Sequence, residues 1–223
     1  MSDYLPAIEI ETRSNPTHAV IWLHGLGADG DDFVPIVPEL GLPPESAVRF
    51  VFPHAPQRPI TINNGYVMRA WYDIEALDGN RRADEAGIAD SAAAIRRLIE
   101  RENARGIPTQ RIVLAGFSQG GAMAYIVGLT HPEQFAGIVA LSAYIPAPAQ
   151  LIDKLGAANR TTPIFAAHGT HDDILPLPMG EFARDTLERQ GYKIEWHAYR
   201  MAHAVCPEEI AVLGRWLGTR LAG

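Results

Sequence analysis

The chain has 223 residues, of which 47 % are hydrophobic and 20 % are charged, a composition typical of a soluble globular protein with a substantial core. Its net charge of −7 argues against a nucleic-acid-binding face, which would be basic. The one cysteine, Cys206, excludes an intrachain disulfide and a cysteine-based metal site, so we expect a reducing, cytoplasmic setting. The first residues lack the pattern of a secretory signal, and no apolar run approaches the roughly 20 residues of a membrane span.

Short apolar runs alternate with amphipathic stretches along the chain, and the length suits a single domain over residues 1–223. Most of the apolar runs are continuous and aliphatic, as in parallel strands that are covered on both faces. This alternation predicts a mainly parallel sheet with helices on both sides. In chain order the predicted elements are the strand Ala19–Leu23, the helix Asp31–Leu40, the strand Val48–Phe52, the helix Asp84–Arg105, the strand Ile112–Gly116, the helix Gln119–Thr130, the strands Gly137–Ser142 and Pro163–His168, the helix Met179–Gln190, the strand Lys193–Tyr199 and the helix Glu208–Leu221.

One segment, His54–Asn80, interrupts this alternation. It is rich in Pro, Asn and Gly and contains no clear periodic element. Long irregular stretches inside a compact domain are often functional. We therefore expect this segment to cover or line an active site.

The strongest chemical signal is the pentapeptide that runs from Gly116 to Gly120, which fits G-x-S-x-G with Ser118 at its centre. It lies between a predicted buried strand and a predicted apolar helix. That context is typical of the nucleophile elbow of α/β-hydrolases, in which a strained turn exposes the serine hydroxyl above the sheet. Glycines on both sides avoid side-chain clashes across so tight a turn. Ser118 is therefore the candidate nucleophile.

A serine nucleophile needs a base, and the base needs an orienting acid. In this fold the acid and then the histidine follow the serine along the chain. Asp172 and Asp173 come just after a predicted strand, and either could be the acid. His203 follows the final predicted strand and is the last histidine of the chain. It is a better candidate for the base than His197, which lies within that strand.

The oxyanion of such a reaction is held by backbone N–H groups. One donor should be the residue after the nucleophile, Gln119, and the other should come from the loop after an early strand. That loop runs from His24 to Gly27 with the sequence HGLG. We expect the N–H of Leu26 to be the second donor, although the same four residues could form a plain turn.

Several long motifs resemble the carboxylesterases and acyl-protein thioesterases of the α/β-hydrolase fold. They are LHGLGADGDDF, FPHAPQRPITINNGYVMRAWYD, GFSQGGAMA, HGTHDDILP and YRMAHAVCPEEI, and together they extend over nearly the whole chain. The resemblance implies an α/β-hydrolase fold with a mainly parallel central sheet, and the short chain leaves no room for a large cap domain. It implies a catalytic triad of Ser118, Asp172 and His203.

The resemblance also decides between the two candidate acids. The family acid stands three residues after the glycine of an HG pair, and counted from Gly169 that residue is Asp172. The family usually has a proline after the acid, whereas this chain has Asp173. The resemblance further places Trp71 beside the acyl site, with a core tryptophan beneath the loop as the alternative. Leu175 is a second candidate for substrate contact.

These features together predict a serine carboxylesterase that hydrolyses carboxylic esters through an acyl-enzyme on Ser118. A main activity as an acyl-protein thioesterase or a lysophospholipase is the alternative. A non-catalytic binding protein of the same fold would typically lack a triad member, and a dienelactone hydrolase would carry cysteine at the elbow. We expect a small-molecule or lipid-like acyl substrate and no metal or cofactor. A homodimer formed through apolar residues near the site entrance is a family-level expectation.

Overall fold

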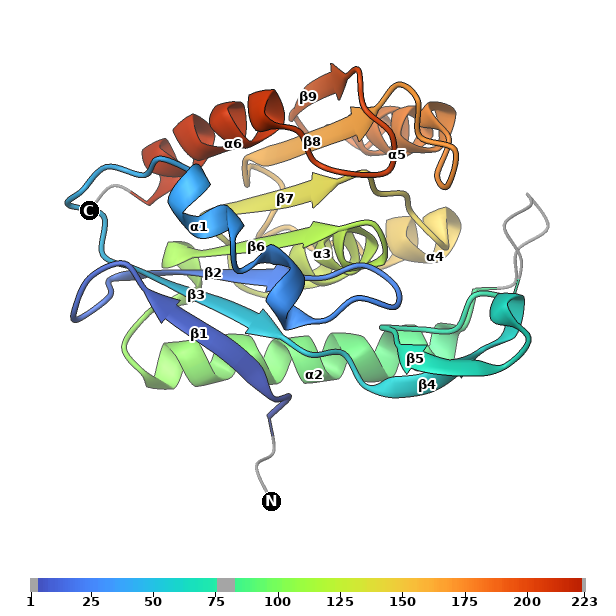
Figure 1. Ribbon diagram of the computed structural model, residues 1–223, viewed down its shortest axis with the longest axis horizontal. Helices are drawn as coiled ribbons and strands as arrows, with labels where there is room; N and C mark the ends of the chain where they lie inside the picture. Colours follow the sequence, from blue (N-terminus) through green and yellow to red (C-terminus); the bar gives the residue numbers. More distant parts are fainter. Residues whose placement is uncertain (1–3, 76–82, 222–223) are drawn as a thin grey trace.

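A seven-stranded sheet with strand order β1-β3-β2-β6-β7-β8-β9 forms the centre of the molecule (Figure 1). The computed structural model describes residues 4–75 and 83–221. β1 pairs antiparallel with β3, and the remaining neighbours are parallel. The prediction of a mainly parallel sheet is therefore confirmed. The strands of this sheet are β1 (Ala7–Glu11), β2 (His18–Leu23), β3 (Val48–Pro53), β6 (Ile112–Phe117), β7 (Gly137–Leu141), β8 (Ile164–Gly169) and β9 (Ile194–Tyr199).

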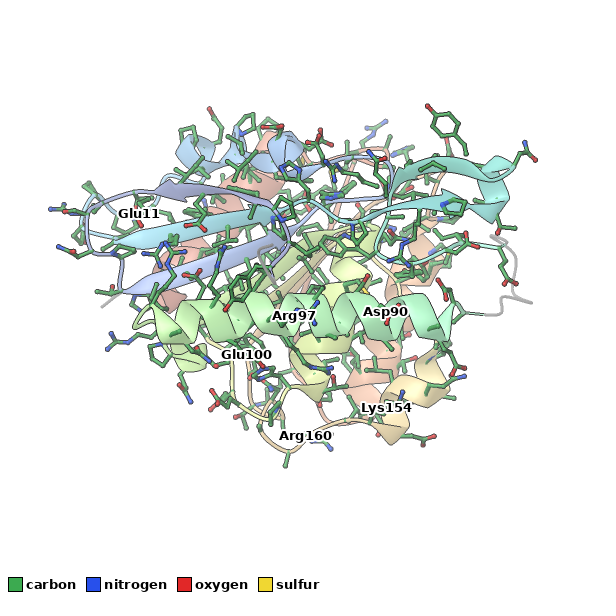
Figure 2. The ribbon with its side chains drawn as sticks, turned by 90° about the horizontal axis from the view of Figure 1, so that it is seen from below. Glu11, Asp90, Arg97, Glu100, Lys154 and Arg160 are labelled. Carbon is green, nitrogen blue, oxygen red and sulfur yellow. The ribbon has the colours of Figure 1, made fainter. Side chains whose placement is uncertain are left out.

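Helices cover both faces of this sheet. The helices are α1 (Ile36–Glu39), α2 (Glu85–Ala104), α3 (Gln119–Thr130), α4 (Pro148–Asp153), α5 (Leu177–Arg189) and α6 (Pro207–Arg220). Alternate residues of β2 point to opposite sides, so that Ile21 packs in the core with α2 and α3 whereas Trp22 packs with α1 and α6. In Figure 2 the long helix α2 lies in front of the sheet, and its exposed residues Asp90, Arg97 and Glu100 are on the solvent side.

Two predicted segments differ from the structure. The predicted helix Asp31–Leu40 is a 3-10 turn, Gly30–Phe33, followed by the single turn α1. Pro35 and Pro38 lie in this segment, and because proline has no backbone N–H, a continuous helix would lose hydrogen bonds there. Two further elements, β1 and α4, were not predicted, and both are short.

The expected irregular segment His54–Asn80 is partly wrong, because it contains the hairpin β4 (Gln57–Ile60) and β5 (Tyr66–Arg69). The 3-10 turn Thr61–Asn63 connects the two strands and ends in Asn64 and Gly65, whose φ angles are 55° and 77°. An Asn-Gly pair is a strong hairpin signal because both residues tolerate positive φ. The end of the segment, from residue 76, lies outside the described residues.

The strand order places a topological switch point between β2 and β6. The chain passes from β2 to β3 on one side of the sheet, whereas β6 pairs with β2 on the other. In open α/β sheets, ligands bind at the carboxyl ends of the strands where the order reverses in this way. The ends of β2 and β6 lie side by side, with Leu23 paired to Gly116. The loops that follow these two strands therefore meet at one place.

Candidate active site

Ser118 occupies a strained turn between β6 and α3. Its φ of 55° and ψ of −119° lie where a non-glycine residue is rarely found, which costs about 1–3 kcal/mol. Its backbone N–H donates to the carbonyl of Leu141 at the end of β7, at 2.8 Å. The next residue, Gln119, begins α3. The turn is therefore held by the neighbouring strand and exposes the hydroxyl above the sheet.

The glycines of the G-x-S-x-G motif are required by close backbone approaches. A Cβ at Gly120 would lie 2.1 Å from the carbonyl oxygen of Leu23, and one at Gly116 would lie 2.3 Å from the carbonyl carbon of Gly120. Both contacts involve backbone atoms, which have little freedom to move. The two glycines therefore let α3 pack directly onto the ends of β2 and β6.

His203 lies between Ser118 and Asp172. Its Nε2 is 2.9 Å from Ser118 Oγ, and its Nδ1 is 2.6 Å from Asp172 Oδ2. Because an ionised carboxylate only accepts hydrogen bonds, Nδ1 carries the proton and Nε2 is free to accept from the serine hydroxyl. Loops after β6, β8 and β9 thus bring the three predicted residues together. Along the sequence, Ser118 is 85 positions from His203 and Asp172 is 31 positions from it.

The structure distinguishes the two candidate acids. Asp172 is buried, and its Oδ1 accepts hydrogen bonds from the N–H groups of Ile174, at 3.0 Å, and Leu175, at 2.7 Å. Asp173 is exposed. The carboxylate that faces His203 is therefore Asp172, as the family spacing implies.

A second histidine supports the acid loop and was not singled out from the sequence. His168 is fully buried, and its Nε2 lies 2.7 Å from the carbonyl oxygen of Leu175 and 3.5 Å from Asp172 Oδ2. Burial lowers the pKa of His168, so a neutral ring donates to that carbonyl. The sequence signal that could have indicated this role is the pair His168-Gly169, which was used only to locate the acid.

A cavity of about 780 Å³ opens onto the serine and the histidine. Its wall includes two of the predicted triad residues, Ser118 and His203, and both predicted oxyanion donors, Leu26 and Gln119. The predicted contact residue Leu175 also lines it. Much of the remaining wall is apolar and includes Phe33, Ile36, Ile62, Ile74, Val205 and Ile210. Ile62 and Ile74 belong to the segment that was expected to line an active site, and they do so.

Trp71 lies beneath the loop that follows β2 rather than in the described cavity wall. The side chain is fully buried, and other residues form the described cavity wall. Its indole N–H donates to the carbonyl of His24 at 2.9 Å, and its backbone N–H donates to Gln119 Oε1 at 2.8 Å. Trp71 is therefore a core residue beneath the loop, which was the alternative interpretation.

The described residues contain neither a metal-binding group nor a membrane span. Within residues 4–75 and 83–221, no three His, Cys, Asp or Glu side chains gather where they could hold an ion. No helix in the same residues is long and apolar enough to cross a bilayer.

A mainly parallel sheet with an elbow serine, a facing histidine and a buried aspartate defines a hydrolase of the α/β-hydrolase fold. The chain belongs to the phospholipase/carboxylesterase family, whose model matches residues 6–220. The expected family, the fold class and the hydrolase activity are thus confirmed.

Relatives and solved structures match nearly the full chain. Acyl-protein thioesterase 1 of Neurospora crassa is 40 % identical over 97 % of this chain and 92 % of its own. Acyl-protein thioesterase 1 of Yarrowia lipolytica is 36 % identical over 95 % of this chain and 96 % of its own. Among solved structures, SOBER1 of Arabidopsis thaliana has a TM-score of 0.86 at 30 % identity, covering 92 % of this chain and 99 % of its own. Zea mays acyl-protein thioesterase 2 has a TM-score of 0.86 at 25 % identity, covering 98 % and 100 %.

Proposed function

We propose that this protein is an acyl-protein thioesterase that removes fatty acyl groups from cysteine side chains through an acyl-enzyme on Ser118. The sequence favoured a carboxylesterase and kept the thioesterase as an alternative. The relatives named acyl-protein thioesterase, at 36 % and 40 % identity over nearly the full chain, favour the alternative. The observation that carries the proposal is the largely apolar cavity directly beside Ser118 and His203.

In the first step His203 Nε2 takes the proton from Ser118 Oγ as the oxygen attacks the acyl carbonyl. The 2.9 Å separation of these atoms is within the range for such a transfer. Asp172 holds the Nδ1–H tautomer at 2.6 Å and stabilises the imidazolium that forms. His203 then gives its proton to the departing thiolate, which leaves as a thiol.

The tetrahedral intermediate carries its negative charge on the former carbonyl oxygen. The backbone N–H groups of Leu26 and Gln119 stabilise this oxyanion, and both residues line the cavity beside Ser118. In the second step His203 takes a proton from a water molecule as its oxygen attacks the ester on Ser118. His203 then returns that proton to Ser118 Oγ as the bond to the acyl carbon breaks and the fatty acid leaves. No step requires a metal or an organic cofactor.

The test is a matched pair of peptides that carry a palmitoyl group on cysteine or, in the same sequence, on serine. We expect kcat/KM to be higher for the thioester, and to rise with acyl length from butanoyl to palmitoyl. Each methylene that enters the apolar cavity should contribute about 0.8 kcal/mol, or about fourfold in kcat/KM. A preference for short oxygen esters would support the carboxylesterase instead. Ser118→Ala is the control for background hydrolysis of the thioester.

A further inference from the structure

His24, in the loop after β2, has a ring whose protonation is fixed by its neighbours. The backbone N–H of Ala55 donates to Nε2 at 3.0 Å, so Nε2 carries a lone pair. The proton is therefore on Nδ1, which donates to the carbonyl of Gly25 at 2.7 Å. His24 is 1 % exposed, and burial lowers its pKa, which keeps the ring neutral as this arrangement requires.

The bond to Gly25 fixes the direction of the Leu26 N–H. The carbonyl of Gly25 and the N–H of Leu26 belong to one planar trans peptide, in which the two groups point in opposite directions. The N–H of Ala28 also donates to this carbonyl, at 3.3 Å. A Cβ on Gly25 would lie 3.4 Å from Ser118 Cβ, so this peptide lies against the nucleophile. Rotation of the peptide would break the bond to His24 and turn the Leu26 N–H away.

The buried Trp71 connects this loop to the other proposed oxyanion donor. Its indole N–H donates to the carbonyl of His24, and its backbone N–H donates to the side chain of Gln119. The amide of Gln119 in turn donates to the carbonyl of Tyr72 at 2.7 Å. Gly27 is tied to the same segment by a 2.9 Å bond from its N–H to the carbonyl of Arg69. The segment Arg69–Tyr72 therefore holds both Gln119 and the loop that carries Leu26.

We propose that His24 and Trp71 are positioning residues that set the N–H groups of Leu26 and Gln119 in place before substrate binds. This inference rests on the proposed function, because it assigns these two N–H groups to an oxyanion hole. Neither side chain touches the substrate in this account. Preset donors need no reorganisation when charge develops, which is the main advantage of an oxyanion hole.

Two substitutions of His24 separate its two hydrogen bonds. In His24→Asn the amide nitrogen takes the place of Nδ1 and donates to Gly25. In His24→Gln the longer side chain reaches the position of Nε2 but has no donor at the position of Nδ1. The account therefore predicts that His24→Asn keeps more activity than His24→Gln, although glutamine is closer to histidine in length. His24→Gln and His24→Ala should lower kcat by about 10- to 100-fold, as expected for a displaced rather than a deleted donor.

The decisive readout compares a transition-state analogue with a ground-state ligand. A long-chain trifluoromethyl ketone adds to Ser118 and places an oxyanion in the hole, whereas the fatty acid product binds without forming one. In His24→Gln the affinity for the ketone should fall in proportion to kcat/KM, while KM and product affinity stay within about twofold of wild type. Trp71→Phe, which removes the indole N–H but keeps a large ring, should show the same pattern and provides a second variant if His24→Gln folds poorly.

His18→Asn is the matched control, because His18 is also a buried histidine but lies at the start of β2, at the opposite end of the strand from the loop that carries His24. It should leave kcat and ketone affinity unchanged. The inference is overturned if His24→Gln and Trp71→Phe keep wild-type kcat and ketone affinity, or if ketone and product affinities fall together. Failure of the proposed function itself would give a different result: wild-type enzyme would prefer short oxygen esters to the palmitoyl-cysteine peptide, while His24→Gln would still lose ketone affinity.

Discussion

At the scale of single residues, Asp172 and Asp173 are adjacent in sequence and have different environments. Asp172 is buried, contacts His203 and accepts two backbone hydrogen bonds, whereas Asp173 is exposed. Asp172→Asn should lower kcat by about 10³- to 10⁴-fold, because the amide favours the wrong tautomer of His203. Asp173→Asn should change kcat by less than about twofold.

Steady-state hydrolysis of the palmitoyl-cysteine peptide by the two variants checks this expectation, with circular dichroism as the test of folding. A crippled Asp173→Asn enzyme beside an active Asp172→Asn enzyme would overturn the assignment of the acid.

At the scale of elements, the start of α6 contains a buried carboxyl group. Glu209 is the third residue of the helix and is fully buried. Burial raises the pKa of its carboxyl to about 8, and the nearby backbone of Cys206 only partly opposes this effect. The folded protein therefore keeps the Glu209 carboxyl protonated at pH values where the unfolded chain has already released the proton.

The stability of the protein should therefore depend on pH through Glu209. Between about pH 4.5 and 8 the folded state binds more protons than the unfolded state, so the free energy of unfolding falls as the pH rises. The total effect is on the order of a few kcal/mol. Urea unfolding at pH 5, 6.5 and 8 should show a decline in wild type that is much smaller in Glu209→Gln. Parallel pH profiles for the two proteins would contradict this prediction.

Which elements the sequence predicts depends on how deeply each one is buried. Most of the parallel strands are continuous apolar runs because both of their faces are covered, whereas the edge strand β9 is only half-buried. The predicted bounds of these strands lie within one residue of the structure at each end. The hairpin β4–β5 is short and mostly exposed or half-buried, so its apolar residues do not form the pattern of a buried strand. Its one clear signal was the dipeptide Asn64-Gly65, which needs no burial to be recognised.

The site residues likewise divide into those that a local sequence pattern predicts and those that it does not. The order of elements along the chain sufficed to predict Ser118 and His203 and to limit the acid to Asp172 or Asp173, because these residues follow recognisable strands. The choice of Asp172 came from the family resemblance. The position of Trp71 depends on what its indole N–H meets, and its partner, the carbonyl of His24, is 47 residues away in sequence. No local pattern encodes such a contact, so the sequence left two interpretations of Trp71 open.

At the scale of the whole molecule, the sheet order explains why one site collects residues from the full length of the chain. β2 and β6 meet at the switch point, and β7, β8 and β9 follow in order on one side. The loops after β2, β6, β8 and β9 therefore open at the same edge and supply Leu26, Ser118, Asp172 and His203. The hairpin β4–β5 lies at this carboxyl end in Figure 1, and nearby residues Ile62 and Ile74 extend the cavity wall.

The central claim is that Ser118 carries the acyl group between the two steps of hydrolysis. Rapid acid quench during turnover of the palmitoyl-cysteine peptide, followed by mass spectrometry of proteolytic fragments, tests it most directly. The account predicts one palmitoyl group on the fragment that contains Ser118 in wild type and none in Ser118→Ala. Turnover by wild type with no acylated fragment, or an acyl group on another residue that persists in an active Ser118→Ala enzyme, would contradict the account.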